Sequence, residues 1–409
     1  MKTKAVRLYK ENDLRLEEFE LREITDGEVL IKIISDSVCM STYKTAKQGA
    51  KHIRVPDDIE TNPVIVGHEF CGEIVKVGKR WENEYKVGEK IIIPPVLEYM
   101  GMSTIGYSFT DIGGASTYSI VYEHIIENGF LIKFNSDTFF KGSIIEPASC
   151  VLRGYKGSVH LKGDDYISGL KQNGKVAILA GCGPMGLEAI DIVLSSSRTP
   201  SLVLVTDIDE AKLKRAESLF KDKAIKNGVK LVFSSASDKE TLLEISGGKG
   251  FDDVFVYAPV SSLVELADSL LAFDGCLNFF AGPIDKNLKA SVNFYDIHYA
   301  QHHFSGTSGS TVDDIKEIAQ MISENKINPA VMITHIGGID AVIDTTLNLP
   351  KIPGGKKLIY THINLPLTAI SDFEKLGETD NRFKVLNEIT IKNNGIWSTE
   401  AEKYLLENF

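Results

Sequence analysis

The sequence predicts an α/β protein in which a β-rich domain is interrupted by a doubly wound parallel sheet and then resumes. Residues 1–153 carry short β-branched runs separated by Gly, Asp, Asn and Pro. From about residue 174, apolar strands alternate with amphipathic helices, and a glycine-rich turn joins the first of these strands to its helix. We therefore expect one domain from residues 1–153 with 310–409, and a second from residues 154–309.

In the β-rich domain, strands are expected in the segments EVLIKIISDSVC, PVIVGHEFCGEIVKVG and EKIIIPPV. The second segment contains Gly67-His68-Glu69, which places two ionisable side chains at the mouth of a strand that enters the core. After the interruption, a helix over 312–327 and the strand GGKKLIYTHI complete this domain. The tail beyond residue 363 ends in a predicted helix, where Thr399 and Glu402 have the spacing of a capping box.

In the interrupting domain, the segments KVAILAG and LVLVTDI are predicted strands, and each is followed by a helical pattern. The second helix follows Asp209, whose side chain is a suitable N-cap. The segments LVFSS, DDVFVYAP, SSLVELADSLLAF and GCLNFFAG continue the alternation. This order predicts parallel strands with helices on both faces of the sheet.

The glycine-rich turn has the form GxGxxG, and we expect its residues to bind a dinucleotide. The first glycine permits the tight turn, the second admits a pyrophosphate to the backbone, and the third lets the helix pack closely. Asp207 ends the next strand, where its carboxylate can accept hydrogen bonds from both ribose hydroxyls and repel a 2′-phosphate. NAD(H) is therefore favoured, with NADP(H) as the alternative. The expected cofactor contacts are Gly181, Gly183, Pro184, Met185, Gly186 and Asp207.

Four residues in the β-rich domain have the side chains of a metal site. Cys39 ends an apolar strand, His68 and Glu69 follow 29 residues later, and Glu146 lies just before the glycine-rich domain. Thiolate, imidazole and carboxylate are the ligands of a catalytic zinc that keeps one position for water or substrate. Such an ion polarises a carbonyl or lowers the pKa of a bound hydroxyl, so this set beside a nicotinamide domain indicates hydride transfer.

These motifs resemble the zinc-dependent medium-chain dehydrogenase/reductase family over residues 1–362, through GHEFCGEIVKVG, GGASTYSIV, EPASC, GCGPMG and GGKKLIY. The resemblance implies a GroES-like catalytic domain and a Rossmann-type nucleotide domain. It implies that Cys39, His68 and either Glu146 or Glu69 hold one catalytic zinc, and that Ser41 relays the substrate proton. It also implies that Lys357 reaches the cofactor pyrophosphate. The segment before GGASTYSIV lacks cysteine, so we expect no structural zinc.

A basic stretch such as the one after Cys39 is usually a solvated face, but beside an active site in an acidic protein it is where a substrate phosphate could dock, and Lys44 and Lys47 are the expected contacts. The Glu146 position is similar to the polyol branch of the family. Within that branch the chain looks closest to the enzymes that reduce L-sorbose 1-phosphate to D-glucitol 6-phosphate. Two alternatives remain open: a dehydrogenase of unphosphorylated polyols or of L-threonine, and an NAD-binding regulator without turnover.

Composition excludes several other classes of function. The net charge of −11 argues against nucleic acid and anionic membranes as partners. No run of eighteen apolar residues and no signal-peptide pattern occurs, and the five scattered cysteines include no CxxC pair. We therefore expect a cytoplasmic enzyme with reduced thiols and a small-molecule substrate, assembled as a homodimer or homotetramer.

Overall fold

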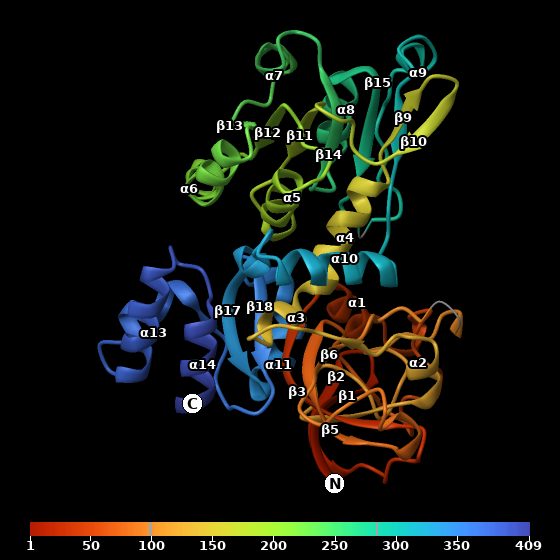
Figure 1. Ribbon diagram of the computed structural model, residues 1–409, viewed down its shortest axis with the longest axis vertical. Helices are drawn as coiled ribbons and strands as arrows, with labels where there is room; N and C mark the ends of the chain where they lie inside the picture. Colours follow the sequence, from red (N-terminus) through yellow and green to blue (C-terminus); the bar gives the residue numbers. More distant parts are fainter. Residues whose placement is uncertain (98–99, 284) are drawn as a thin grey trace. The chain divides into compact units, whose positions relative to one another are not determined.

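The computed structural model describes residues 1–97, 100–283 and 285–409 and forms two compact units (Figure 1). The first unit contains residues 1–146, 315–324 and 329–409, and the second contains residues 147–314 and 325–328. The helix α4 (Ile145–Lys156) belongs to the second unit from Pro147 onward, and within that unit its Tyr155 hydroxyl donates to the Ala189 carbonyl at 2.7 Å. Both units are mixed α/β structures, as the sequence predicts.

The first unit is built on an eight-stranded sheet with the order β19-β17-β18-β3-β5-β6-β8, in which β7 also pairs with β3. A smaller sheet has the order β2-β1-β4. All these pairs are antiparallel except β17 with β18. The strands are β1 (Lys2–Lys10), β2 (Asp13–Glu20), β3 (Val29–Val38), β4 (Val64–Ile65), β5 (Phe70–Val77), β6 (Lys90–Ile92), β7 (Tyr118–Val121), β8 (Ile132–Lys133), β17 (Ile333–Gly338), β18 (Lys356–Tyr360) and β19 (Thr368–Ala369).

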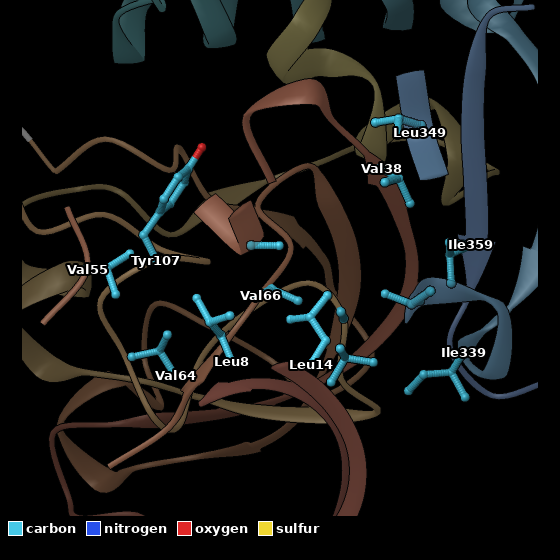
Figure 2. Packing of buried hydrophobic residues seen from close by; sticks show 14 of the residues in the cluster. Leu8, Leu14, Val38, Val55, Val64, Val66, Tyr107, Ile339, Leu349 and Ile359 are labelled. Atoms are coloured by element: carbon cyan, nitrogen blue, oxygen red, sulfur yellow. The ribbon is translucent and has the colours of Figure 1, made fainter. Parts of the chain in front are cut away.

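The helices of this unit lie along and beside these sheets. They are α1 (Met40–Gln48), α2 (Glu123–Glu127), α3 (Phe140–Ser143), α11 (Val342–Asn348), α12 (Phe373–Leu376), α13 (Asn381–Lys392) and α14 (Thr399–Asn408), together with most of α10 (Val312–Ser323). A cluster of buried aliphatic side chains fills the space between β1, β3, β18 and α11 (Figure 2). Burial of these side chains stabilises the part of the unit from which the site residues project.

The second unit contains a six-stranded parallel sheet with the order β13-β12-β11-β14-β15-β16, the strand order of a dinucleotide-binding fold. The strands β11 and β12 are almost entirely apolar and buried, and α5 packs beside β11, and α8 beside β14 and β15 (Figure 1). The sheet strands are β11 (Lys175–Leu179), β12 (Leu202–Thr206), β13 (Lys230–Ser234), β14 (Phe251–Val256), β15 (Leu271–Phe279) and β16 (His303–Ser305), and β9 (Val159–Lys162) and β10 (Asp165–Ser168) form a hairpin. The helices are α5 (Pro184–Leu194), α6 (Glu210–Lys226), α7 (Lys239–Ile245), α8 (Ser261–Ser269) and α9 (Phe294–Tyr299).

Two helix caps were predicted, and one of these predictions is wrong. Asp209 caps α6, as expected, by accepting the backbone N–H groups of the second and third helical residues. At α14 the N-cap is Ser398, one residue earlier than the expected Thr399, and its hydroxyl accepts from the Ala401 N–H at 3.2 Å. Glu402 therefore lies outside a capping box, and its carboxylate is directed into the protein instead. Among the described helices, none has the length and apolar composition needed to cross a membrane.

Candidate active site

The segment that carries His68 is a break between two strands rather than the single strand that its apolar residues suggest. The strand β4 ends at Ile65 and β5 begins at Phe70. Between them Gly67 has a φ of +90°, a conformation that disfavours any side chain. A Cβ at this position would also lie 2.4 Å from a carboxylate oxygen of Asp36. The glycine therefore allows the turn that exposes the histidine and the following glutamate to the site.

Cys39 lies between a strand and a helix. It follows β3 and is the N-cap residue of α1, with an extended backbone and no side-chain bond to the helix. Its thiol is therefore not used for capping. In the antiparallel pairing of β18 with β3, Lys357 lies opposite Val38, so Lys356 comes next in register, beside Cys39.

The ligand atoms of Cys39, His68 and Glu69 lie within 4.8 Å of one another. The Ser41 hydroxyl is 3.0 Å from the Cys39 sulfur and 3.2 Å from His68 Nε2, so Nε2 is the ring nitrogen that faces the thiol. The other ring nitrogen, Nδ1, lies 3.4 Å from the buried Thr42 hydroxyl. A hydroxyl behind a metal-ligating imidazole is the kind of partner that fixes its orientation.

Glu69 makes an ion pair that sequence reasoning missed. The Lys356 ammonium is 2.6 Å and 2.7 Å from the two Glu69 carboxylate oxygens, and both side chains are buried. Burial opposes the charge of Lys356, but the neighbouring negative groups, Glu69 first, raise its pKa. Lys356 precedes Lys357, the lysine that the resemblance assigns to the cofactor, and nothing in the local sequence indicates a partner for it. Pairing with Glu69 could be found only by knowing that β18 lies next to β3.

The donor set fits a zinc ion. Burial, with the charge of Glu69, raises the pKa of the Cys39 thiol to about 12. A thiolate at this position therefore requires a further positive charge, which a divalent cation would supply. One thiolate, one imidazole nitrogen and a carboxylate at these separations are the ligands of a catalytic zinc site. Cys39 and His68 would hold the ion, with Glu69 or Glu146 as the carboxylate ligand.

Glu146 lies outside the group of ligand atoms within 4.8 Å of each other, in the first turn of α4. Its charge nevertheless contributes to raising the pKa of Cys39 and of Lys356, which places it in the same electrostatic environment. Which glutamate binds the metal therefore stays a prediction. Glu69 is nearer to the other ligand atoms, but its carboxylate is already shared with Lys356.

Tyr107 is a second residue near the site that sequence reasoning did not identify. Its ring centroid is 5.2 Å from that of His68, and the ring is buried. Figure 2 shows Tyr107 at the edge of the aliphatic cluster, with its hydroxyl directed away from the aliphatic side chains.

The predicted phosphate contacts lie on α1, where Lys44 is half-buried and Lys47 is exposed. The Lys47 ammonium nitrogen lies 5.7 Å from the centroid of the Tyr43 ring.

The glycine-rich turn in the second unit has the geometry that a dinucleotide requires. A Cβ at Gly186 would lie 2.2 Å from the Gly181 carbonyl oxygen, so only glycine allows this approach of helix to strand. A Cβ at Gly183 would meet nothing within 4 Å, and no side chain caps α5. The N-terminus of α5, where Pro184 and Met185 lie, is therefore open to a pyrophosphate.

Asp207 follows β12, and each of its carboxylate oxygens accepts one backbone N–H: that of Cys182 at 3.1 Å and that of Asp209 at 3.1 Å. These bonds fix the carboxylate and leave acceptor capacity for ribose hydroxyls.

Lys357, in the other unit, is buried, and its ammonium donates to the carbonyls of Ile352, Pro353 and Gly355. This gives Lys357 a local structural role, and its contact with a cofactor stays a prediction.

Two parts of the chain match known families. Residues 25–128 match the family described as alcohol dehydrogenase GroES-like domain, and residues 201–324 match the family described as zinc-binding dehydrogenase. Among solved structures, 2R,3R-butanediol dehydrogenase from Bacillus subtilis is similar with a TM-score of 0.71 and 24% identity, over 88% of this chain and all of that one. At this identity the likeness supports the fold alone.

Three curated relatives are similar over nearly the full length. The chain is 46% identical to the uncharacterized protein YggP of Escherichia coli, over 100% of this chain and 98% of that protein. It is 43% identical to L-sorbose 1-phosphate reductase of Klebsiella pneumoniae, over 99% and 97% of the two chains. It is also 43% identical to mannitol-1-phosphate 5-dehydrogenase of Aliivibrio fischeri, again over 99% and 97%.

Proposed function

Because this chain belongs to the zinc-dependent alcohol dehydrogenase family, we propose that it transfers a hydride between NAD(H) and a ketose phosphate. The substrate that we propose is L-sorbose 1-phosphate, which would be reduced at its C2 ketone to D-glucitol 6-phosphate. The observation that carries the reaction type is the group of Cys39, His68 and Glu69, in which His68 and Glu69 are buried and Cys39 is half-buried. The substrate is supported by two relatives of 43% identity whose names specify phosphorylated six-carbon compounds.

When bound, zinc would polarise the substrate carbonyl as a Lewis acid and the reduced nicotinamide would supply the hydride. Cys39, His68 and one glutamate would hold the metal. The open N-terminus of α5 would bind the pyrophosphate. Asp207 would accept hydrogen bonds from the ribose hydroxyls, and its charge would repel a 2′-phosphate. We propose one metal site and a preference for NAD(H) over NADP(H).

Reduction of a ketone also delivers one proton to the carbonyl oxygen. Ser41 is the proposed donor because its hydroxyl lies beside both ligand atoms, 3.0 Å from the Cys39 sulfur and 3.2 Å from His68 Nε2. We propose Glu146 as the second group that takes part in moving this proton, because its charge acts on Cys39 and Lys356. We propose that Lys44 and Lys47 of α1 contact the substrate phosphate.

The test is NADH oxidation by the zinc-loaded protein with L-sorbose 1-phosphate and with unphosphorylated L-sorbose, and with NADPH as a parallel cofactor. We expect kcat/KM to be at least about 100-fold higher for the phosphate ester, equivalent to about 2.7 kcal/mol. Fructose 6-phosphate is tested as a third compound. Its phosphate lies at the opposite end of the molecule from the ketone, so it shows whether the position of the phosphate matters. Equal rates with and without phosphate would contradict the proposal and leave a general polyol dehydrogenase.

A further inference from the structure

The basic residues from Lys44 in α1 to Arg54 fall into two groups. Lys51 is on the surface, where its ammonium pairs with the Glu11 carboxylate at 2.6 Å. Lys44, His52 and Arg54 are half-buried, and within residues 1–97, 100–283 and 285–409 no carboxylate forms an ion pair with any of them. Among the described residues, Lys44 and Arg54 thus have no carboxylate within ion-pair distance, although the whole chain has a net charge of −11.

The backbone holds the side chain of His52 in a defined orientation. Its Nδ1 accepts the backbone N–H of Arg54 at 3.2 Å. In the neutral imidazole the proton must then lie on Nε2, so this nitrogen is a hydrogen-bond donor. Burial, and then the charges of Arg54 and Lys44, lower the pKa of His52. This effect of the two cations on the imidazole agrees with their close approach.

Hydrogen bonds fix both the side chain and the backbone of Arg54. One guanidinium nitrogen, Nη1, donates to the Thr104 hydroxyl at 2.9 Å, and the Ser108 hydroxyl donates to the Arg54 carbonyl at 2.6 Å. The next residue, Val55, is buried in the same aliphatic cluster as Tyr107 (Figure 2). The guanidinium is therefore positioned in advance, with N–H groups beyond Nη1 for a second acceptor.

The Tyr107 ring lies near His52 and Arg54 and also near the candidate metal ligand His68. Its centroid is 5.5 Å from the His52 ring and 5.2 Å from the His68 ring, and the Arg54 guanidinium carbon is 6.0 Å from the same centroid. A single aromatic ring thus lies near His52 and Arg54 as well as near the imidazole of the candidate metal site. A small molecule that carries both a ketone and an anionic group could contact both sides of this ring.

We propose that His52 and Arg54, together with Lys44, form the subsite that binds the phosphate group of the substrate. The inference rests on the proposed function, since it names the residues that would select a phosphorylated ketose. An imidazole N–H, a planar guanidinium and an ammonium are suitable donors for a phosphate dianion. Arg54 and His52 lie outside α1 and are thus additional to the two lysines named above.

The variant that tests the subsite is Arg54→Gln, and its control is Lys51→Gln, which removes a surface charge from the same segment. The measurement is kcat/KM for L-sorbose 1-phosphate and for unphosphorylated L-sorbose with NADH. We expect Arg54→Gln to reduce the ratio of the two values by about 10- to 100-fold, because a charged hydrogen bond to the phosphate is lost. Lys51→Gln should leave the ratio within about twofold. An unchanged ratio in Arg54→Gln would overturn the inference.

A binding experiment separates failure of the subsite from failure of the proposed function. Inorganic phosphate is titrated into the protein while the carbon-bound ring protons of His52 are followed by NMR, with His52→Gln used for assignment. We expect saturable shifts in the wild type and in Lys51→Gln, and at least about tenfold weaker binding in Arg54→Gln. If the wild type prefers the phosphate ester but His52 does not respond to phosphate, the subsite is wrong and the function stands. If His52 responds but the ester is not preferred, the substrate is wrong and the anion site stands.

Discussion

At the scale of single residues, Lys356 and Glu69 show what burial does to an ion pair. The Lys356 side chain is 10% exposed and that of Glu69 1%, and the ammonium contacts both carboxylate oxygens. The surface pair of Lys2 with Glu18 has the same chemistry at 2.9 Å, with exposures of 68% and 58%. Removing one partner leaves the other without compensation only in the buried pair.

We predict that Lys356→Gln lowers the free energy of unfolding by about 3 kcal/mol, because the Glu69 charge would remain buried without its counter-ion. Lys2→Gln is the matched control and should leave this free energy almost unchanged, since water solvates both of its groups. Urea denaturation of the two variants at equal zinc content measures the difference. Equal losses of stability would show that burial does not distinguish these pairs.

At the scale of elements, the C-terminal helix α14 is attached to the segment that leads to Glu146. The Glu402 carboxylate accepts the backbone N–H groups of Phe139 and Phe140, each at 2.8 Å, at the start of α3. It also accepts the Tyr360 hydroxyl at 3.0 Å, and this hydroxyl in turn accepts the Trp397 indole N–H at 2.8 Å. The tail thus stabilises the segment before the candidate glutamate from a distant part of the chain.

We predict that Glu402→Ala destabilises the protein by about 3 kcal/mol, because two backbone donors and one hydroxyl would lose their buried acceptor. The fluorescence of Trp397, which is 1% exposed, should shift to longer wavelength as the helix loosens. Glu400→Gln, on the exposed side of the same helix, should change neither quantity. If Glu402→Ala behaves like Glu400→Gln, α14 does not depend on this carboxylate.

At the scale of the whole molecule, the two units carry different candidate binding sites. The candidate metal-binding residues lie in the first unit, and the glycine-rich turn expected to bind the dinucleotide lies in the second. A ligand that binds only the folded form stabilises the unit to which it binds, by about 2.7 kcal/mol at 100 times its dissociation constant. Zinc and NADH should therefore protect different parts of the backbone from exchange with solvent.

We predict that zinc slows hydrogen exchange in peptides around residues 39–69, and that NADH slows it in peptides from residues 175–207. In Cys39→Ala the effect of zinc should disappear while that of NADH remains. Hydrogen exchange followed by mass spectrometry measures both effects in one experiment. Equal protection of both units by either ligand would show instead that they open as one cooperative body.

The sequence by itself determined the features that short segments encode. The run of strands, the alternation of strand and helix, and the turn from Gly181 to Gly186 follow from periodicity and from the conformations that glycine allows, so the fold class could be predicted. Cys39 and His68 could be predicted as metal ligands because each belongs to a local motif with ligand chemistry, and their binding of a metal stays a prediction. The ends of elements were predicted less accurately: the strand break at Gly67 and the N-cap at Ser398 were both missed, because element ends depend on single contacts.

The tertiary structure alone decided which distant residues share one environment. Lys356 is 287 residues from Glu69, and they meet because β18 pairs with β3 in a particular register. Glu402 reaches Phe139 over 263 residues, and Arg54 lies near the Thr104 and Tyr107 side chains through the path of a loop. The physical reason is that buried charges must be paired or hydrogen-bonded, and the partner is whichever group the fold places beside them, which no local pattern records.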